Sequence, residues 1–229
     1  MPINRTLQRD MVVRRASREV RRLQLIEATI DSLATRGFSE TTMAEVAKGA
    51  GLSNGIVNFH FESKEKLLIA TLQHMADEYA DHWRSALEKA GPDPAARLWA
   101  LVVADFDPRI CSRRKLAAWC AFWGEARSRP TYQAHCGARD RAYQIMFQNL
   151  FLELAAATPA SQRPADPPAI ALVIDALLDG LWLRMMFDET LTRKRALAAA
   201  QALLIEVFPQ HFASRKAASD DDADDDDAD

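Results

Sequence analysis

Two short helical patterns separated by a tight turn constrain the fold of this chain more than any other feature. The first pattern begins at Thr42, where a Thr-x-x-Glu spacing ending at Glu45 is typical of a capped helix start. Gly51 can take the left-handed backbone conformation that ends such a helix, and Ser53 or Asn54 can cap the next one. The segment therefore predicts a helix-turn-helix.

A helix-turn-helix has one dominant use, which is to place its second helix in the major groove of DNA. We expect that helix at about residues 54–60, with its exposed start at base edges and its later residues near phosphates. The predicted DNA-binding residues are Thr42, Ser53, Asn54, Gly55, Asn58, His60 and Lys64. A partly buried packing role stays open for His60, and at least one of Phe59 and Phe61 is expected in the core.

The residues around this motif resemble the TetR family of bacterial repressors. The resemblance covers about residues 20–70 and depends on short pieces at fixed spacing, which are Gly37-Phe38, Thr41-Thr42, residues 56–61 and residues 64–68. It implies a dimeric repressor that reads double-stranded operator DNA. The chain departs from the family at Asn58, where many members carry a tyrosine that touches the DNA backbone.

The two ends of the chain carry opposite charge. Residues 1–22 hold seven arginines against Asp10 and Glu19, which favours contact with phosphate or the minor groove. Residues 219–229 hold eight aspartates, without which the net charge of −3 becomes +5. We expect a basic disordered arm at 1–17 and a disordered acidic tail at 213–229, which we hypothesise competes with DNA for the arm. The alternatives are a leader without a fixed partner and a tail that only aids solubility.

Beyond residue 63 every apolar pattern has helical period, which predicts an all-α fold. The first helix is expected from Arg18 to about residue 35 and completes a three-helix DNA-binding domain at 18–62. A larger helical ligand-binding and dimerisation domain is expected at 63–212. Its helices are expected at about residues 63–87, 94–106, 113–127, 131–156, 167–187 and 193–208.

Motifs and composition exclude several function classes. No run of about 18 apolar residues exists, so no membrane span is expected, and no secretory signal begins the chain. The three cysteines, Cys111, Cys120 and Cys136, lack metal spacing, which favours reduced thiols in a cytoplasmic protein without metal or cofactor. No nucleophile elbow or phosphate-cradling glycine loop occurs, so neither catalytic residues nor an enzyme are expected. The protein would associate with the nucleoid when bound to DNA.

Aromatic residues concentrate in the larger helical part. Aromatic faces can hold a quaternary ammonium ion by cation–π attraction, and a nearby carboxylate adds Coulomb attraction. The predicted ligand-binding residues are Asp107, Trp119, Phe122, Trp123, Tyr132, Asp179 and Trp182, with Glu125 as a further candidate carboxylate. A plain packing role stays open, because Trp and Phe at helical spacing are also common in a core.

Pieces of this part resemble the choline-responsive repressors within the TetR family. They are Phe106-Asp107, residues 118–123 and residues 174–184. The resemblance implies repression of genes for choline uptake and glycine betaine synthesis in osmotic stress, relieved by choline. It also implies a homodimer joined through the helices at about 167–187 and 192–208. The alternatives are a multidrug- or cation-sensing repressor of an efflux or catabolic operon, and an architectural DNA binder without a ligand.

Overall fold

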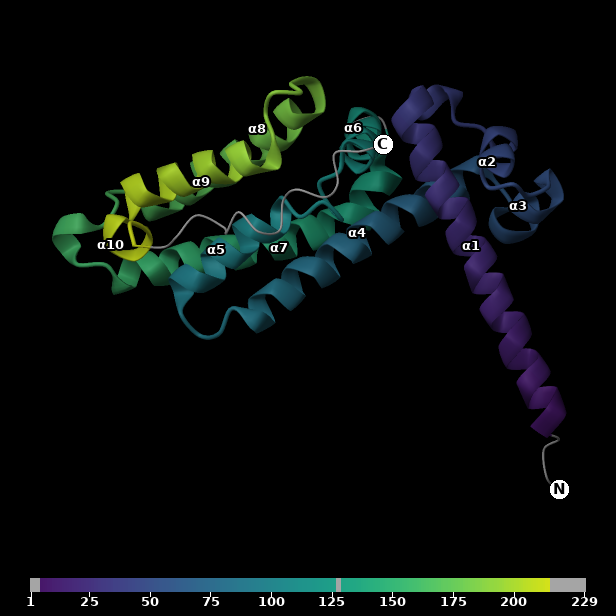
Figure 1. Ribbon diagram of the computed structural model, residues 1–229, viewed down its shortest axis with the longest axis horizontal. Helices are drawn as coiled ribbons and strands as arrows, with labels where there is room; N and C mark the ends of the chain where they lie inside the picture. The colour runs from purple at the N-terminus through teal and green to yellow at the C-terminus, as the bar shows by residue number, and fades with distance from the viewer. Residues whose placement is uncertain (1–4, 127–128, 215–229) are drawn as a thin grey trace. The chain divides into compact units, whose positions relative to one another are not determined.

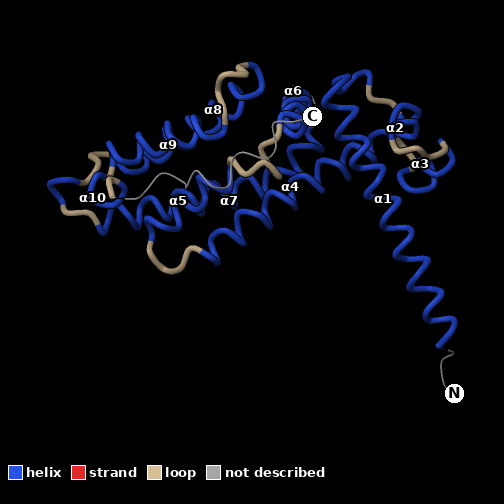
Figure 2. Tube along the Cα trace, viewed as in Figure 1, coloured by secondary structure: helices blue, strands red, loops and turns tan. Residues whose placement is uncertain are grey.

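In a computed structural model of the protein, residues 5–126 and 129–214 are described, except for the side chains of 5–16, 126, 133 and 135–140. All regular structure in these ranges is helical, as Figures 1 and 2 show, and the all-α prediction is confirmed. The acidic tail from residue 215 and the first four residues of the basic arm lie outside the described residues.

The chain divides into two compact units. The first comprises the chain up to residue 75 together with residues 117–136, and the second comprises residues 76–116 and the chain from 137 onward. Three helices contribute residues to both units: α4 (Lys64–Lys89), α6 (Arg113–Ala126) and α7 (Pro130–Ala157). Neither unit ends at residue 62, and the functional boundary expected there stays a prediction.

The first unit begins with a helix longer than the sequence predicts. Helix α1 (Arg5–Glu40) starts at Arg5, whereas a disordered arm was expected over residues 1–17. That expectation is corrected for residues 5–17, which are helical. The physical reason is that no glycine or proline interrupts the chain between residues 3 and 36, where arginine, leucine and glutamine favour a helix. Gly37, at φ 78°, then breaks the regular helix before its last three residues.

The helix-turn-helix forms from α2 (Met43–Gly49) and α3 (Asn54–Phe61). The Thr42 hydroxyl accepts the Glu45 backbone N–H at 3.2 Å, as the capping spacing predicts. The Glu45 carboxylate pairs with Arg36 of α1 at 3.1 Å, so it joins two helices.

The turn between α2 and α3 ends the first of these helices as expected. Gly51 has φ 64°, its N–H donates to Lys48 O at 3.1 Å, and the Leu52 N–H donates to Ala47 O at 2.9 Å. These two bonds define a Schellman motif, which satisfies carbonyls at the helix end. Val57 of α3 is fully buried, so the second helix packs through it.

The second unit contains α5 (Pro94–Asp105), a single turn η1 (Ala160–Gln162), α8 (Pro167–Phe187), α9 (Arg193–Val207) and α10 (Pro209–Phe212). Helices α5, α8 and α9 each begin after a capping residue, because the side chains of Asp93, Asp166 and Thr192 each accept a backbone N–H three residues on. Helix α9 packs against α5, α8 and α10. The short α10 was not predicted; a proline starts it, and Phe212 in it is fully buried.

Candidate DNA-reading surface and ligand site

The start of α3 presents an open surface. Ser53, Asn54, Gly55 and Asn58 are all exposed, as base or phosphate contact requires. Thr42 is exposed as well, although its hydroxyl already serves as the cap of α2. These predicted residues thus lie on or beside one short helix, and their contacts with DNA stay a prediction.

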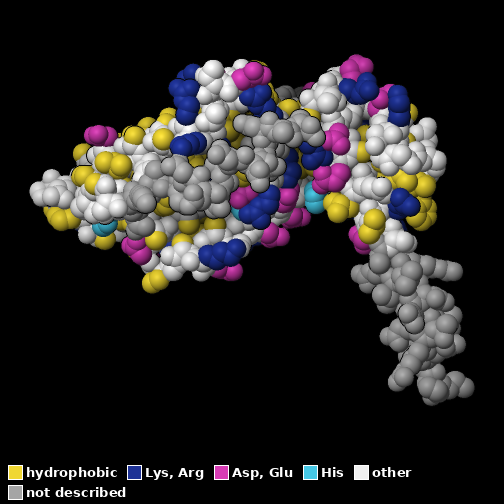
Figure 3. All heavy atoms as spheres, in the orientation of Figure 1, with side chains coloured by type: hydrophobic (Ala, Val, Ile, Leu, Met, Phe, Trp, Pro, Cys, Tyr) yellow, Lys and Arg dark blue, Asp and Glu magenta, His cyan; other side chains and the backbone are white. Residues whose placement is uncertain are grey.

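Two phenylalanines on α3 have opposite environments. Phe61 is buried, which confirms that at least one of the pair is core, whereas Phe59 is 68% exposed. Figure 3 shows hydrophobic side chains at the surface over α3, and the Arg18 guanidinium lies 5.4 Å from the Phe59 ring centroid. Since apolar side chains contact the thymine methyl in the major groove, Phe59 is a base-contact candidate. The sequence contains a signal for the exposure of Phe59. Val57 and Phe61 are four residues apart and share the buried face of α3, and Phe59 lies outside that face.

His60 is half-buried between the rings of Phe59 and Phe61. Burial lowers the pKa of His60, and the charges of Arg18 and Arg22 lower it further. The imidazole is therefore neutral near pH 7, so it can offer a phosphate a hydrogen bond but little charge.

Lys64 is held more tightly than a free phosphate-binding lysine. Its ammonium donates to the carbonyls of Phe38 and Ser39, each at 3.1 Å, which uses two of its three donors. Burial, followed by the charge of Arg129, lowers the pKa of Lys64. Lys64 thus fixes the turn that follows Gly37, and one donor is left for the predicted phosphate contact.

The predicted ligand-binding residues fall into both units. Trp119, Phe122, Trp123 and Tyr132 belong to the first unit, where the Trp119 and Trp123 rings stack at 6.3 Å. Trp119, Phe122 and Tyr132 are buried, while Trp123 is 47% exposed. Phe122 and Tyr132 contact each other edge to face at 5.8 Å.

The other three predicted residues lie in the second unit. Asp107 accepts two hydrogen bonds from the Arg109 guanidinium, both at 2.9 Å, and lies 3.5 Å from His82. Burial opposes ionisation of Asp107, but Arg109 and His82 outweigh it and hold the pKa of that carboxyl below its usual value. Asp179 is exposed on α8, whereas Trp182 is buried and donates its indole N–H to Asp105 O at 3.0 Å.

That contact leads to a site that the sequence analysis missed. The Asp105 carboxylate is buried and accepts hydrogen bonds from the hydroxyls of Tyr79, at 2.7 Å, and Tyr143, at 2.5 Å. Rings surround it, since Tyr79 lies 5.5 Å from Tyr143 and 6.0 Å from Trp182, and Trp83 lies 5.9 Å from Tyr143. We call these five residues the Asp105 cluster.

The electrostatics of the Asp105 cluster are unusual. Burial raises the pKa of Asp105 to about 7, although the two tyrosine hydrogen bonds act in the opposite direction. The negative charges of Asp175 and Asp179 also raise the pKa of Asp105, by less than burial does. Among the described residues, no lysine or arginine pairs with this carboxylate. A buried carboxylate ringed by aromatic faces is suited to a cation that brings no strong hydrogen-bond donors of its own.

Helices α4, α5, α7 and α8 all contribute to the Asp105 cluster, which explains why spacing did not reveal it. One signal was present: Leu98, Leu101 and Val102 form the buried stripe of α5, and Asp105 continues that stripe. Burying a carboxylate costs free energy, so a carboxylate at an apolar position of a helix indicates a candidate functional residue.

The described part of the chain offers neither a metal site nor a membrane span. No group of three or more histidine, cysteine or acidic side chains there could hold a metal ion. No helix there is long and apolar enough to cross a membrane.

A helix-turn-helix reader followed by a larger helical part defines the class of helix-turn-helix transcription regulators. Residues 25–71 match the tetR family of bacterial regulatory proteins, and residues 94–209 match the C-terminal part of the BetI-type transcriptional repressors. The chain therefore belongs to the TetR family, with a BetI-type C-terminal part. It is a DNA-binding transcriptional repressor and not an enzyme, as the sequence predicts.

Individual relatives agree with this assignment. The HTH-type transcriptional regulator BetI from Burkholderia thailandensis is 39% identical over 170 residues, which are 73% of this chain and 82% of the relative. A transcriptional regulator from Pseudomonas aeruginosa has a TM-score of 0.70 at 26% identity, over 85% of this chain and 94% of its own. A regulator from Saccharomonospora viridis, solved in complex with choline, has the same fold, with a TM-score of 0.68 at 20% identity over 80% and 94% of the two chains.

Proposed function

We propose that this repressor releases its operator when a small quaternary ammonium cation, choline in the first place, binds in the Asp105 cluster. The regulated genes would be those of choline uptake and glycine betaine synthesis, and the repressor would act in the cytoplasm. The observation that carries the proposal is a buried carboxylate surrounded by tyrosine and tryptophan rings. The BetI relatives and the choline complex of a protein with this fold support it.

The geometry of the cluster explains the choice of ligand. A quaternary ammonium ion cannot donate N–H hydrogen bonds, so it gains its binding energy from aromatic faces and from opposite charge. Asp105 supplies that charge from an interior position, where screening by water is weak. Because the carboxylate is buried, a small cation fits the cluster better than the bulky lipophilic cations of a multidrug sensor.

The predicted DNA contacts belong to the same proposal. Thr42, Ser53, Asn54, Gly55, Asn58, His60 and Lys64 would contact operator DNA, and Phe59 would add an apolar base contact. Helix α4 runs from Lys64, beside the reader, to residues of the unit that holds the Asp105 cluster, so it is the proposed lever. Ligand binding needs only to favour a conformer that fits the operator poorly, with a typical coupling of about 1–3 kcal/mol.

A homodimer is also proposed, since one short reader helix recognises too little DNA alone. Helix α8 has an apolar face on its exposed side, formed by Leu172, Val173, Leu183 and Phe187. A Cβ added at Gly180 would meet no atom within 4 Å, so a second helix can approach closely there. We assign this face to the α8 of a second copy of the chain.

The first experiment is a choline titration followed by tryptophan fluorescence, run alongside release from DNA upstream of the protein's own gene. We expect saturable quenching together with release. Asp105→Asn should weaken choline binding at least tenfold and leave operator affinity unchanged, because the carboxylate lies outside the reader. The exposed carboxylate of Asp81 on α4 provides the control variant Asp81→Asn, which should behave like the native protein. Unchanged choline affinity in Asp105→Asn would refute the assigned site, and release that ignores choline would refute the ligand.

A further inference from the structure

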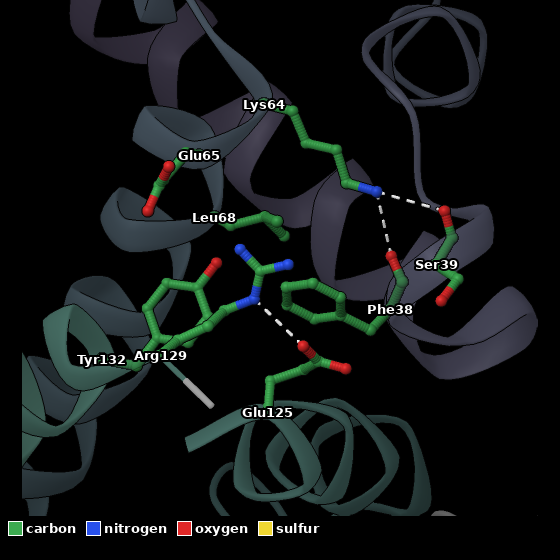
Figure 4. Close-up of a pocket in the computed structure, with 8 residues that line it drawn as sticks. All are labelled: Phe38, Ser39, Lys64, Glu65, Leu68, Glu125, Arg129 and Tyr132. Atoms are coloured by element: carbon green, nitrogen blue, oxygen red, sulfur yellow. Dashed lines mark hydrogen bonds and ion pairs between the residues drawn. The ribbon is translucent and has the colours of Figure 1, made fainter. Parts of the chain in front are cut away.

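The first unit contains a pocket that the proposed function does not use. It has a volume of about 390 Å³ and is lined by the last residues of α1 and α6, the first turns of α4 and α7, and Arg129 just before α7. Its lining residues are Phe38, Ser39, Lys64, Glu65, Leu68, Glu125, Arg129 and Tyr132, and Figure 4 shows them around the side chain of Arg129.

Arg129 lies in an aromatic cage of two rings, Phe38 and Tyr132. Its guanidinium carbon is 5.0 Å from the Phe38 ring centroid and 5.8 Å from that of Tyr132. The buried ring of Phe122 packs against both of these rings, at 6.3 Å from Phe38 and 5.8 Å from Tyr132, and so supports the cage. Glu125 accepts a hydrogen bond from Arg129 Nε at 3.0 Å. Aromatic faces with one carboxylate are the groups that proteins use to bind organic cations.

Two observations indicate that Arg129 is a replaceable occupant. Its side chain is 41% exposed, so it can leave the cage for solvent without disturbing the core. The Tyr132 hydroxyl is buried, faces the Arg129 guanidinium in Figure 4, and has no hydrogen-bond partner among the described residues. A buried hydroxyl without a partner is unfavourable, so this arrangement leaves a polar group of the cage unsatisfied.

We propose that the cage of Phe38 and Tyr132, with Glu125, is a second binding site for a small organic cation, and that Arg129 is its intramolecular competitor. The site goes beyond the proposed function, because it lies in the first unit and shares no residue with the Asp105 cluster. A side chain tethered beside the cage competes at an effective concentration on the order of millimolar. The native protein therefore fills this site only when the free cation is abundant.

Occupation of the cage affects the turn between Gly37 and Thr41, which leads into the helix-turn-helix. Phe38 follows the break at Gly37, and Lys64 holds its carbonyl by a hydrogen bond. Thr41, three residues on, is buried, donates to Gly37 O at 2.8 Å, and precedes the cap of α2. A cation that replaces Arg129 thus changes the contacts of the turn that positions the helix-turn-helix.

The test measures a gain of binding. Tetramethylammonium is titrated by calorimetry into the full chain carrying Asp105→Asn, which removes the carboxylate of the other site. Adding Arg129→Gln should tighten binding about tenfold, because the competitor is removed. Arg129→Lys keeps a competing cation and should give little gain. Arg113→Gln, which breaks a surface pair with Glu189 in the second unit, is the matched control without gain.

Phe38→Leu, added to the Arg129→Gln protein, should abolish the gain because one wall of the cage is lost. Thermal unfolding followed by circular dichroism checks that each variant is folded. Equal binding with and without Arg129→Gln would overturn the proposal, and so would a gain that survives Phe38→Leu. Failure of the proposed function is a separate result, since it would be seen as undiminished choline affinity in Asp105→Asn alone.

Discussion

At the scale of a single residue, the raised pKa of Asp105 predicts that both stability and choline binding depend on pH. Its pKa is raised from 3.8 to about 7, so the folded state binds a proton that the unfolded chain releases between those values. The free energy of unfolding should therefore fall as pH rises from about 4 to about 7, by up to about 4 kcal/mol. Choline should bind about tenfold more weakly at pH 6 than at pH 8, because the cation needs the ionised carboxylate.

Chemical denaturation and choline titration at pH 5.5, 7 and 8 would measure both effects. Asp105→Asn removes the titrating group, so both pH dependences should be much reduced in that variant, and Asp81→Asn should keep them. The assignment fails if the native protein and Asp105→Asn show the same pH profile.

Single residues also show where sequence reasoning reached its limit. The turn glycine Gly51 was predictable, because its conformation depends on neighbours a few residues away. Tyr79 and Tyr143 were not, because three helices must pack before their hydroxyls meet one carboxylate. For Phe59 and Phe61 we left the choice of core residue open, although the four-residue spacing of Val57 and Phe61 already favours Phe61, which is the buried one.

At the scale of elements, helix α8 should join two copies of the chain. Phe187 is 74% exposed and Leu172 is 60% exposed, although most of the helix is apolar. In a two-fold dimer the same face meets itself, so one aspartate in it places two charges in the interface. Phe187→Asp and Leu172→Asp should each give a monomer by light scattering and weaken operator binding at least tenfold.

Ile145 on α7 provides the matched control for this experiment. It is 57% exposed but lies on another helix, so Ile145→Asp should leave the dimer intact. A dimer that persists in both α8 variants would assign the interface to a different face.

Elements were predictable where local chemistry sets their ends. Asp93, Asp166 and Thr192 each cap the helix that begins after them, because a side-chain oxygen there satisfies a free backbone N–H. The start of α1 was not predictable from charge, since arginine favours both a helix and a solvated arm. The short α10 is too brief for any periodicity to show.

At the scale of the whole molecule, charge is separated between the ends of the chain. The acidic segment at 219–229 outweighs the rest, which carries +5 without it. Tethered aspartates can occupy the basic residues that otherwise meet DNA phosphates, at an effective concentration set by the tether. The full chain should therefore bind its operator more weakly than the same chain without residues 219–229.

Removal of residues 219–229 should tighten operator binding several-fold at low salt. The effect is electrostatic, so it should shrink as salt rises and the Debye length falls from about 10 Å at 0.1 M to about 3 Å at 1 M. Fluorescence anisotropy with labelled operator over a salt series would measure it. A chain of native length with all eight aspartates replaced by asparagine keeps the tether and loses the charge, so it should match the truncated protein. If the asparagine chain binds like the native chain while the truncated protein binds more tightly, tail length rather than charge controls affinity. Equal binding by all three proteins at low salt would show that the tail has no role in DNA binding.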